Sequence, residues 1–226
     1  MNCNHIFNKA LNLTHQEITR KVAIHEAGHA AAIYLGNKQK RLPPIFFQIF
    51  ITSVNDDFQS SRFLSKLATK YIANIGGGRL IHTLPSSIEE ATNGFSLAQK
   101  IAYQRAFEAD MINILTGSLA EARYIAQRDG KLINSGLIQL HDLHYFGGAS
   151  DLESVHEYLE CFIANSALRE QKITALFLAA FGFVNERSNW RAITALADYI
   201  VREDKSVIEC NEIIDVLETA NRGSAF

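Results

Sequence analysis

Apolar residues recur every three or four positions along most of the chain, which predicts a protein built mainly from helices. The first predicted helix runs from about Thr14 to Leu35, and Thr14 with Glu17 matches the capping box that opens many helices. Gly36 follows, where a left-handed C-terminal cap is expected. Later helices are predicted at residues 96–127, where Thr116–Gly117 could interrupt the helix, from a second capping box at Ser150–Glu153, and at 173–184, 189–201 and 211–220.

Two segments instead carry the β-forming residues that are typical of strands. Ile45–Thr52 is rich in Phe and Ile, and Tyr71–Leu84 surrounds three consecutive glycines, which predicts a strand or a hairpin there. Residues 131–148 are polar and predict a loop. The expected fold is therefore mainly α with a small β element. Residues 14–226 are expected to form one domain, preceded by an N-terminal extension of residues 1–13.

Composition restricts the class of protein further. The chain has 226 residues, 47% of them hydrophobic and 20% charged, and its net charge of −2 does not favour binding to nucleic acid or an anionic membrane surface. Cys3, Cys161 and Cys210 are odd in number and widely spaced, which argues against a disulfide framework and favours a cytoplasmic setting. Residues 1–16 lack the apolar run of a signal peptide, and residues 173–184 are too short an apolar run for membrane insertion.

The sequence His25-Glu26-Ala27-Gly28-His29, within the first predicted helix, carries the candidate chemistry. Four residues turn a helix by about 400°, so His25 and His29 project from nearly the same face. Two imidazoles one turn apart can bind one zinc ion, and Glu26 is placed to act as a general base toward a water activated by the metal. The alternative is a chance arrangement of two histidines and a glutamate on a partly exposed helix. Gly28 is costly in a helix interior, which indicates a packing or access reason for it.

A catalytic zinc ion normally has three protein ligands, so the third must come from outside this helix. Asp151 is the leading candidate, because residues 147–148, both glycines, would fix its position in the first turn of a helix. The alternative is that Asp151 only complements the helix dipole. Glu121 could ligate the metal directly, support a ligating histidine through a hydrogen bond, or be a solvated helix residue. His141 and His144, in the polar loop, are the remaining candidates.

Three segments resemble the peptidase domain of the FtsH family, the membrane-bound AAA+ zinc metalloproteases. His25–Ala30 matches the zinc helix of that family in every residue. Residues 117–121 (Gly-Ser-Leu-Ala-Glu) are similar to its Gly-Gly-Arg-x-Ala-Glu segment, and residues 148–152 (Gly-Ala-Ser-Asp-Leu) to its Gly-Ala-Ser-Asn-Asp-Ile/Leu segment. Residues 195–217 also resemble the end of that domain. The resemblance covers residues 14–218 in the same order and implies an FtsH-peptidase-like helical domain.

This resemblance implies that His25, His29 and Asp151 are zinc ligands and that Glu26 is the catalytic base. The sequence departs from the family pattern in three ways. One residue is missing before Asp151, Ser118 stands where the family has a glycine, and the segment between the second and third motifs is longer. The ATPase module and transmembrane helices that precede the domain in that family have no counterpart here, and no phosphate-binding Gly-x-x-x-x-Gly-Lys-Ser/Thr loop occurs. A stand-alone domain is therefore expected.

We expect a zinc metalloendopeptidase, independent of ATP, that hydrolyses flexible polypeptides while the substrate extends along residues 45–52 by strand addition. Two other functions stay open. One is a non-catalytic FtsH-peptidase-like module for binding or regulation, although the presence of Glu26 argues against it. The other is a structural helical domain in which the motif arose by chance. A polypeptide substrate is the expected partner, and a homo-oligomer or a separate unfoldase is compatible with the sequence.

Overall fold

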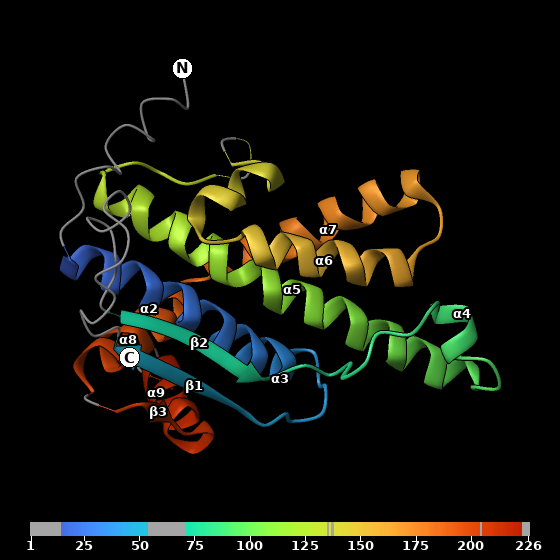
Figure 1. The fold of residues 1–226 in the computed structure, drawn as a ribbon, viewed down its shortest axis with the longest axis horizontal. Helices are drawn as coiled ribbons and strands as arrows, with labels where there is room; N and C mark the ends of the chain where they lie inside the picture. The colour runs from blue at the N-terminus through green and yellow to red at the C-terminus, as the bar shows by residue number, and fades with distance from the viewer. Residues whose placement is uncertain (1–14, 54–70, 135, 137, 204, 223–226) are drawn as a thin grey trace, which may run out of the picture.

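The computed structural model describes residues 15–53, 71–134, 136, 138–203 and 205–222, and this part of the chain is mainly helical with a small antiparallel sheet (Figure 1). The expected fold class, mainly α with a small β element, is confirmed. The described α-helices are α2 (His15–Ala31), α3 (Asn37–Gln39), α4 (Ile88–Ala91), α5 (Leu97–Arg128), α6 (Ala149–Phe162), α7 (Ser166–Asn185), α8 (Arg187–Arg202) and α9 (Cys210–Arg222). The other elements are the π-helix η2 (Ala32–Gly36), the 3-10 helix η3 (Leu140–Phe146) and strands β1 (Phe47–Ser53), β2 (Tyr71–Gly77) and β3 (Val207–Ile208).

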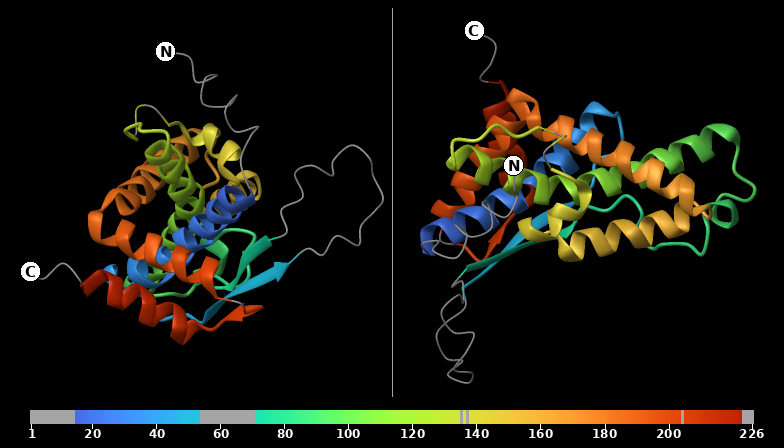
Figure 2. Two further views of the ribbon diagram at one scale, coloured as in Figure 1. Left: turned by 90° about the vertical axis from the view of Figure 1, so that its left-hand side faces the viewer. Right: turned by 90° about the horizontal axis from the view of Figure 1, so that it is seen from above.

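Helix α2 lies at the centre of the molecule. It packs against α5, α8 and β2, so it is enclosed between other helices and the sheet (Figure 1 and Figure 2). Helices α6 and α7 cover other parts of α5, and α9 packs on α8 and β1. Ala23, Ala27, Ala30 and Ala31 of α2 have no exposed surface, and their small side chains let the neighbouring elements approach closely. The helix that carries the His-Glu-x-x-His motif is therefore held from several sides.

The crossing of α2 and α5 depends on glycines. A Cβ atom added to Gly28 would lie 2.8 Å from the Cβ atom of Ala120 and 2.9 Å from the carbonyl oxygen of Thr116, which is too close for any larger residue. The packing reason expected for Gly28 is thus confirmed. Gly117 of α5 is constrained by α2, because a Cβ atom added to this glycine would lie 2.3 Å from Nε2 of His29.

The end predicted for the first helix at Gly36 is wrong. Gly36 has right-handed helical angles, φ −64° and ψ −44°, and the chain continues through η2 into α3. Gly36 is buried, and an added Cβ atom would lie 3.5 Å from the ring of Phe183, so packing against α7 favours continued helix over a left-handed cap. The capping box expected at Thr14 lies outside the described residues.

Other predicted helix boundaries need smaller corrections. Helix α5 runs without interruption through Thr116–Gly117, and it follows a capping box formed by Ser96 and Gln99. Helix α6 begins one residue before Ser150, with Gly148 as its N-cap and no side-chain cap, so the second capping box predicted from the sequence is wrong. The segment 131–148, expected as a loop, contains η3.

Among the described residues, the sheet has the strand order β2-β1-β3, and both pairs are antiparallel. Strand β1 is therefore central: it pairs with β2 along its whole length and with β3 at Ile49 and Phe50. The expectation that a substrate peptide adds to residues 45–52 is wrong, because neighbouring strands already occupy both edges of β1. Strand β3 has only two residues, which is too short for any periodicity to predict it.

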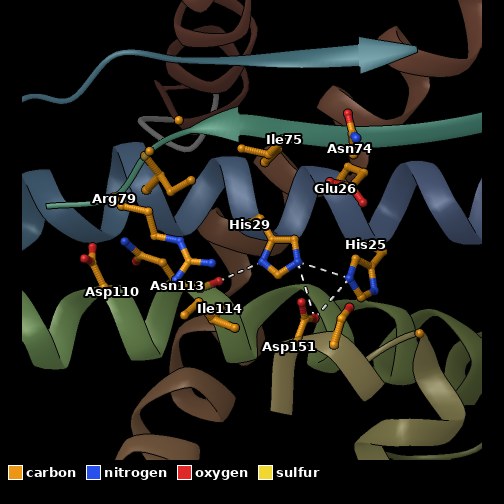
Figure 3. Close-up of a pocket in the computed structure, with 15 residues that line it drawn as sticks. His25, Glu26, His29, Asn74, Ile75, Arg79, Asp110, Asn113, Ile114 and Asp151 are labelled. Atoms are coloured by element: carbon orange, nitrogen blue, oxygen red, sulfur yellow. Dashed lines mark hydrogen bonds and ion pairs between the residues drawn. The ribbon is translucent and has the colours of Figure 1, made fainter. Parts of the chain in front are cut away.

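The strand or hairpin predicted at residues 71–84 is a single strand, β2, that ends at the glycines. Gly77 and Gly78 both have positive φ angles, +84° and +78°, which L-residues with side chains rarely adopt. The chain leaves the sheet at this point and passes to Arg79, next to α5 (Figure 3). Because β2 is an outer strand of the described sheet and packs on α2, its free edge lies beside the motif helix.

No helix in the described part of the chain combines the length and apolar character that a membrane crossing requires. Cys161 is half-buried and Cys210 is buried, and both are free thiols. Cys3 lies outside the described residues.

Replacing Gly28 by Ala tests the close α2–α5 contact. The added methyl group overpacks the crossing, so we expect the free energy of unfolding to fall by about 1–3 kcal/mol in urea denaturation. The matched control is Gly182→Ala in α7, where an added Cβ atom meets nothing within 4 Å. Only the higher helix propensity of alanine acts at Gly182, so the free energy of unfolding of this control should rise by up to about 1 kcal/mol. Equal stabilisation of both variants would show that the two helices do not cross at Gly28.

Candidate metal centre

His25 and His29 lie one turn apart on α2, and both face α5 and the start of α6 (Figure 3). Their rings meet edge to face with centroids 4.8 Å apart, and their Nε2 atoms are 3.0 Å apart. His25 is buried, and His29 is half-buried at the wall of a pocket. The helical spacing of the motif thus brings two imidazole nitrogens to one point, as predicted.

Asp151, in the first turn of α6, brings a carboxylate oxygen to the same point. Its Oδ2 atom lies 3.2 Å from Nε2 of His25 and 3.5 Å from Nε2 of His29. Ligand atoms about 2.0–2.1 Å from a tetrahedral zinc ion are roughly 3.3–3.4 Å apart, so these three atoms have nearly the spacing of one face of such a site. His25, His29 and Asp151 therefore form a group that could hold a metal ion.

Local packing explains how Asp151 reaches the histidines. Gly147 is in the left-handed conformation, with φ +72°, and turns the chain into α6. Gly148 lies so close to α5 that an added Cβ atom would be 2.3 Å from Oγ of Ser118. The Ser118 hydroxyl donates a hydrogen bond to Oδ2 of Asp151 at 3.0 Å. Ser118 thus holds Asp151, the third candidate ligand, in place.

The outer nitrogen of each imidazole also has an acceptor beside it. Nδ1 of His29 lies 2.9 Å from the backbone oxygen of Asn113, and Nδ1 of His25 lies 3.4 Å from Oε2 of Glu121. The second distance is long for a hydrogen bond, and the contact is mainly electrostatic. Glu121 is itself held by Lys21, whose Nζ atom lies 2.9 Å from Oε1. These partners favour a proton on each Nδ1 and leave both Nε2 atoms free to bind a metal.

The position of Glu121 bears on its three possible roles. Its carboxylate lies behind His25, on the side away from the three converging atoms, and it is 5% exposed. Glu121 is therefore neither a solvated helix residue nor part of the cluster, and it is placed to orient His25. His141 and His144 are exposed residues of η3 and do not join the cluster.

The buried carboxylates make this point of the molecule attractive to a cation. Burial by itself lowers the pKa of His25, but its contacts with Asp151 and Glu121 and the charge of Glu26 outweigh it and raise that pKa to about 10. Burial would raise the pKa of Asp151, yet the nearby imidazoles of His25 and His29 hold it well below its usual range. The negative potential that favours a proton on His25 equally favours a metal ion between the same groups.

Glu26 is not one of the three converging groups, but it lines the same pocket on the side that faces the sheet. Its carboxylate lies on the β2 side of α2, near Asn74, and accepts a hydrogen bond from the backbone N–H of Ile75 (Figure 3). Burial raises the pKa of Glu26, while the positive charges of His29 and His25 act to lower it. A half-buried carboxylate whose pKa burial raises is better suited to accept and return a proton than a fully solvated one.

One pocket of about 280 Å³ joins these groups, and some of its residues were not predicted from the sequence. Asn113 contributes a backbone oxygen, and a backbone contact leaves no signal in residue type. Arg79 follows the three glycines, whose pattern predicted a strand, turn or hairpin and no role for the arginine. Asp110 gave no signal because it belongs to no recognisable motif within its long helix. The pocket is lined by His25, Glu26, His29, Ile33, Asn74, Ile75, Gly77, Gly78, Arg79, Asp110, Asn113, Ile114, Gly147, Ser150 and Asp151.

Comparisons of the chain with protein-family models, with curated proteins and with solved structures found no match.

Metal titration of single variants tests the cluster. His25→Ala, His29→Ala and Asp151→Ala each remove one of the three converging atoms, so we expect each to weaken zinc binding more than 100-fold. Glu121→Ala removes only the group behind His25 and should cost roughly 10–100-fold. His141→Ala, which changes an exposed histidine outside the cluster, is the control and should bind zinc as tightly as the wild type. A larger loss for Glu121→Ala than for Asp151→Ala would exchange the two assigned roles.

Proposed function

We propose that the chain is a zinc-dependent peptidase of the FtsH-peptidase-like kind. The observation that carries this proposal is the meeting of three segments that resemble that family. The motif of α2, residues 117–121 of α5 and residues 148–152 of α6 are far apart in sequence, yet each contributes to the same small cluster. A chance motif would not be expected to bring its partner segments into contact.

The chemistry of the three donors supports zinc. Two imidazole nitrogens and one carboxylate oxygen, spaced as on one face of a tetrahedron, are the donor set of many catalytic zinc sites, which keep a fourth position open. When bound, zinc would polarise the carbonyl of the substrate and lower the pKa of water toward neutrality. His25, His29 and Asp151 would hold the ion, and Glu121 and the backbone of Asn113 would orient the two rings.

Glu26 is the proposed general base. Its carboxylate takes a proton from the attacking water as the water oxygen forms a bond to the carbonyl carbon. It then gives that proton to the amide nitrogen as the carbon–nitrogen bond breaks. The N–H of Ile75 holds the carboxylate at the pocket wall, on the side where β2 passes. A binding module would have no use for a base held in this position.

Strand β2 is the proposed place for the peptide. In the described sheet β2 is an outer strand, and Asn74, Ile75 and Gly77 line the same pocket as the cluster. An extended peptide could pair with this edge through backbone hydrogen bonds and lay one carbonyl beside Glu26 and the histidines. Folded proteins cannot supply an extended segment, so flexible polypeptides are the proposed substrates.

Replacing Glu26 by Gln tests the catalytic role. Glutamine keeps the size of the side chain but cannot accept the proton, so we expect kcat on a disordered, casein-like protein to fall by about 10²–10⁴-fold. Zinc content, measured by elemental analysis, should stay at one ion per chain because Glu26 is not one of the converging donors. Glu157→Gln, on an exposed face of α6, is the matched control and should keep full activity.

The same assay separates the proposed function from its alternatives. Cleavage should not respond to ATP, and a stable folded domain should resist it. A zinc-loaded wild type that cleaves neither substrate would favour the non-catalytic module. ATP-stimulated degradation of the folded domain by this chain alone would contradict the proposal of an ATP-independent peptidase.

A further inference from the structure

Arg79 is a charged pocket residue that the proposed chemistry does not use. It follows the glycines that end β2, is half-buried, and shares the pocket with His29. Figure 3 shows its side chain reaching from the end of β2 toward α5, beside Asn113 and on the side of His29 away from His25. The pocket thus has a guanidinium at the end beyond His29, where Asp110 also contributes to the lining.

Asp110 fixes the backbone from which Arg79 extends. This aspartate of α5 is fully buried, and its two oxygens accept hydrogen bonds from the N–H groups of Leu80 at 2.9 Å and Ile81 at 2.8 Å. The Tyr158 hydroxyl lies 3.3 Å from the same carboxylate and 3.2 Å from the carbonyl oxygen of Ile81. The two residues after Arg79 are therefore pinned to α5 and α6. Asp110 is a positioning residue for this segment.

The guanidinium of Arg79 contacts and hydrogen-bonds Tyr158, and its charge acts on the buried carboxylate of Asp110 without a direct ion pair. Its central carbon lies 5.4 Å from the centre of the Tyr158 ring, so the ring carries one face of the group. Among the described residues, no carboxylate lies within ion-pair distance of Arg79, and Asp110 already has its backbone donors. A guanidinium presents a planar fork of N–H donors that matches a carboxylate at two points. Apart from its hydrogen bond with Tyr158, the guanidinium has no hydrogen-bond or ion-pair partner among the described residues, so its other N–H donors could bind such a carboxylate in the pocket.

The size of the pocket limits where that partner can be. A sphere of the pocket volume is roughly 8 Å across, which is about the length of two extended residues at 3.3–3.6 Å each. A peptide with its carbonyl beside Glu26 would therefore place a group one or two residues away against Arg79. That group would meet a positive charge in a partly buried place, where an anion is favoured and a cation is excluded.

We propose that Arg79 binds a carboxylate of the substrate, so that the peptidase prefers an acidic side chain or a free C-terminus within two residues of the bond that is cleaved. This inference rests on the proposed peptidase function. An acidic side chain and a free C-terminus both present a carboxylate to the guanidinium of Arg79.

Matched peptides test the preference with the wild type alone. A peptide with Glu near its cleavable bond should have a kcat/KM on the order of 10- to 100-fold above the same peptide with Gln, the range expected for hydrogen bonds to a charged group. A second pair, with a free or an amidated C-terminus two residues from that bond, separates an α-carboxylate from a side-chain carboxylate. Equal rates within both pairs would overturn the proposal.

Variants then assign the preference to Arg79. Arg79→Gln should bring the Glu-to-Gln ratio close to 1, and Arg79→Glu should reverse it in favour of a Lys peptide. Arg202→Gln is the control, because Arg202 also stacks on a tyrosine, Tyr199, but lies on the surface of α8 outside the pocket. This control should keep the wild-type ratio. If Arg79→Gln slows all peptides equally, Arg79 has a structural role and the proposal is wrong.

Binding measurements separate this proposal from the peptidase proposal. Zinc-loaded Glu26→Gln should bind the Glu peptide about 10-fold or more tightly than the Gln peptide in calorimetry, and the double variant with Arg79→Gln should lose the difference. Catalysis plays no part in this readout. A selective Kd together with an inactive wild type would contradict only the peptidase function. Equal Kd values would contradict only the role of Arg79.

Discussion

The close crossing of α2 and α5 is the constraint on which the candidate centre depends. Gly28 lets the two backbones approach, because any side chain there would clash with Ala120 and the backbone of Thr116. Gly117, on the facing side, leaves room for the ring of His29. The same approach sets Ser118 against the start of α6, and Ser118 in turn holds Asp151. The close approach of the two backbones therefore positions the three candidate ligands, and the small residues at the crossing leave room for their side chains.

The sequence predicted the parts of this centre that local spacing determines. His25 and His29 share a helical face because four residues separate them, and the glycines before Asp151 predicted its place in the first turn of a helix. The mainly α fold followed from helical periodicity in the same way. Residues whose roles depend on distant contacts gave no such signal. Asp110 anchors the backbone of residues 80–81 from thirty positions away, and only the folded chain brings the two together.

The errors in the prediction also have long-range causes. Gly36 reads as a helix cap, but burial beside Phe183 keeps it helical. Strand β1 was expected to have a free edge, but β3 pairs with it from residues 207–208 near the end of the chain. In the described sheet the outer strands are β2 and β3, and the free edge of β2 lies beside Glu26. Helical periodicity was therefore enough to predict the helix that carries the motif. Which strand lies beside that helix depends on the long-range pairing of β1 with β3, which the sequence pattern does not reveal.

The most direct test of the central claim is a crystal structure of the zinc-loaded protein with anomalous diffraction recorded on both sides of the zinc absorption edge. The account predicts one anomalous peak about 2.0–2.2 Å from Nε2 of His25, Nε2 of His29 and Oδ2 of Asp151, with Glu121 behind His25 and not bound to the ion. A peak at the exposed histidines of η3, or a zinc ion ligated by Glu121 in place of Asp151, would contradict it.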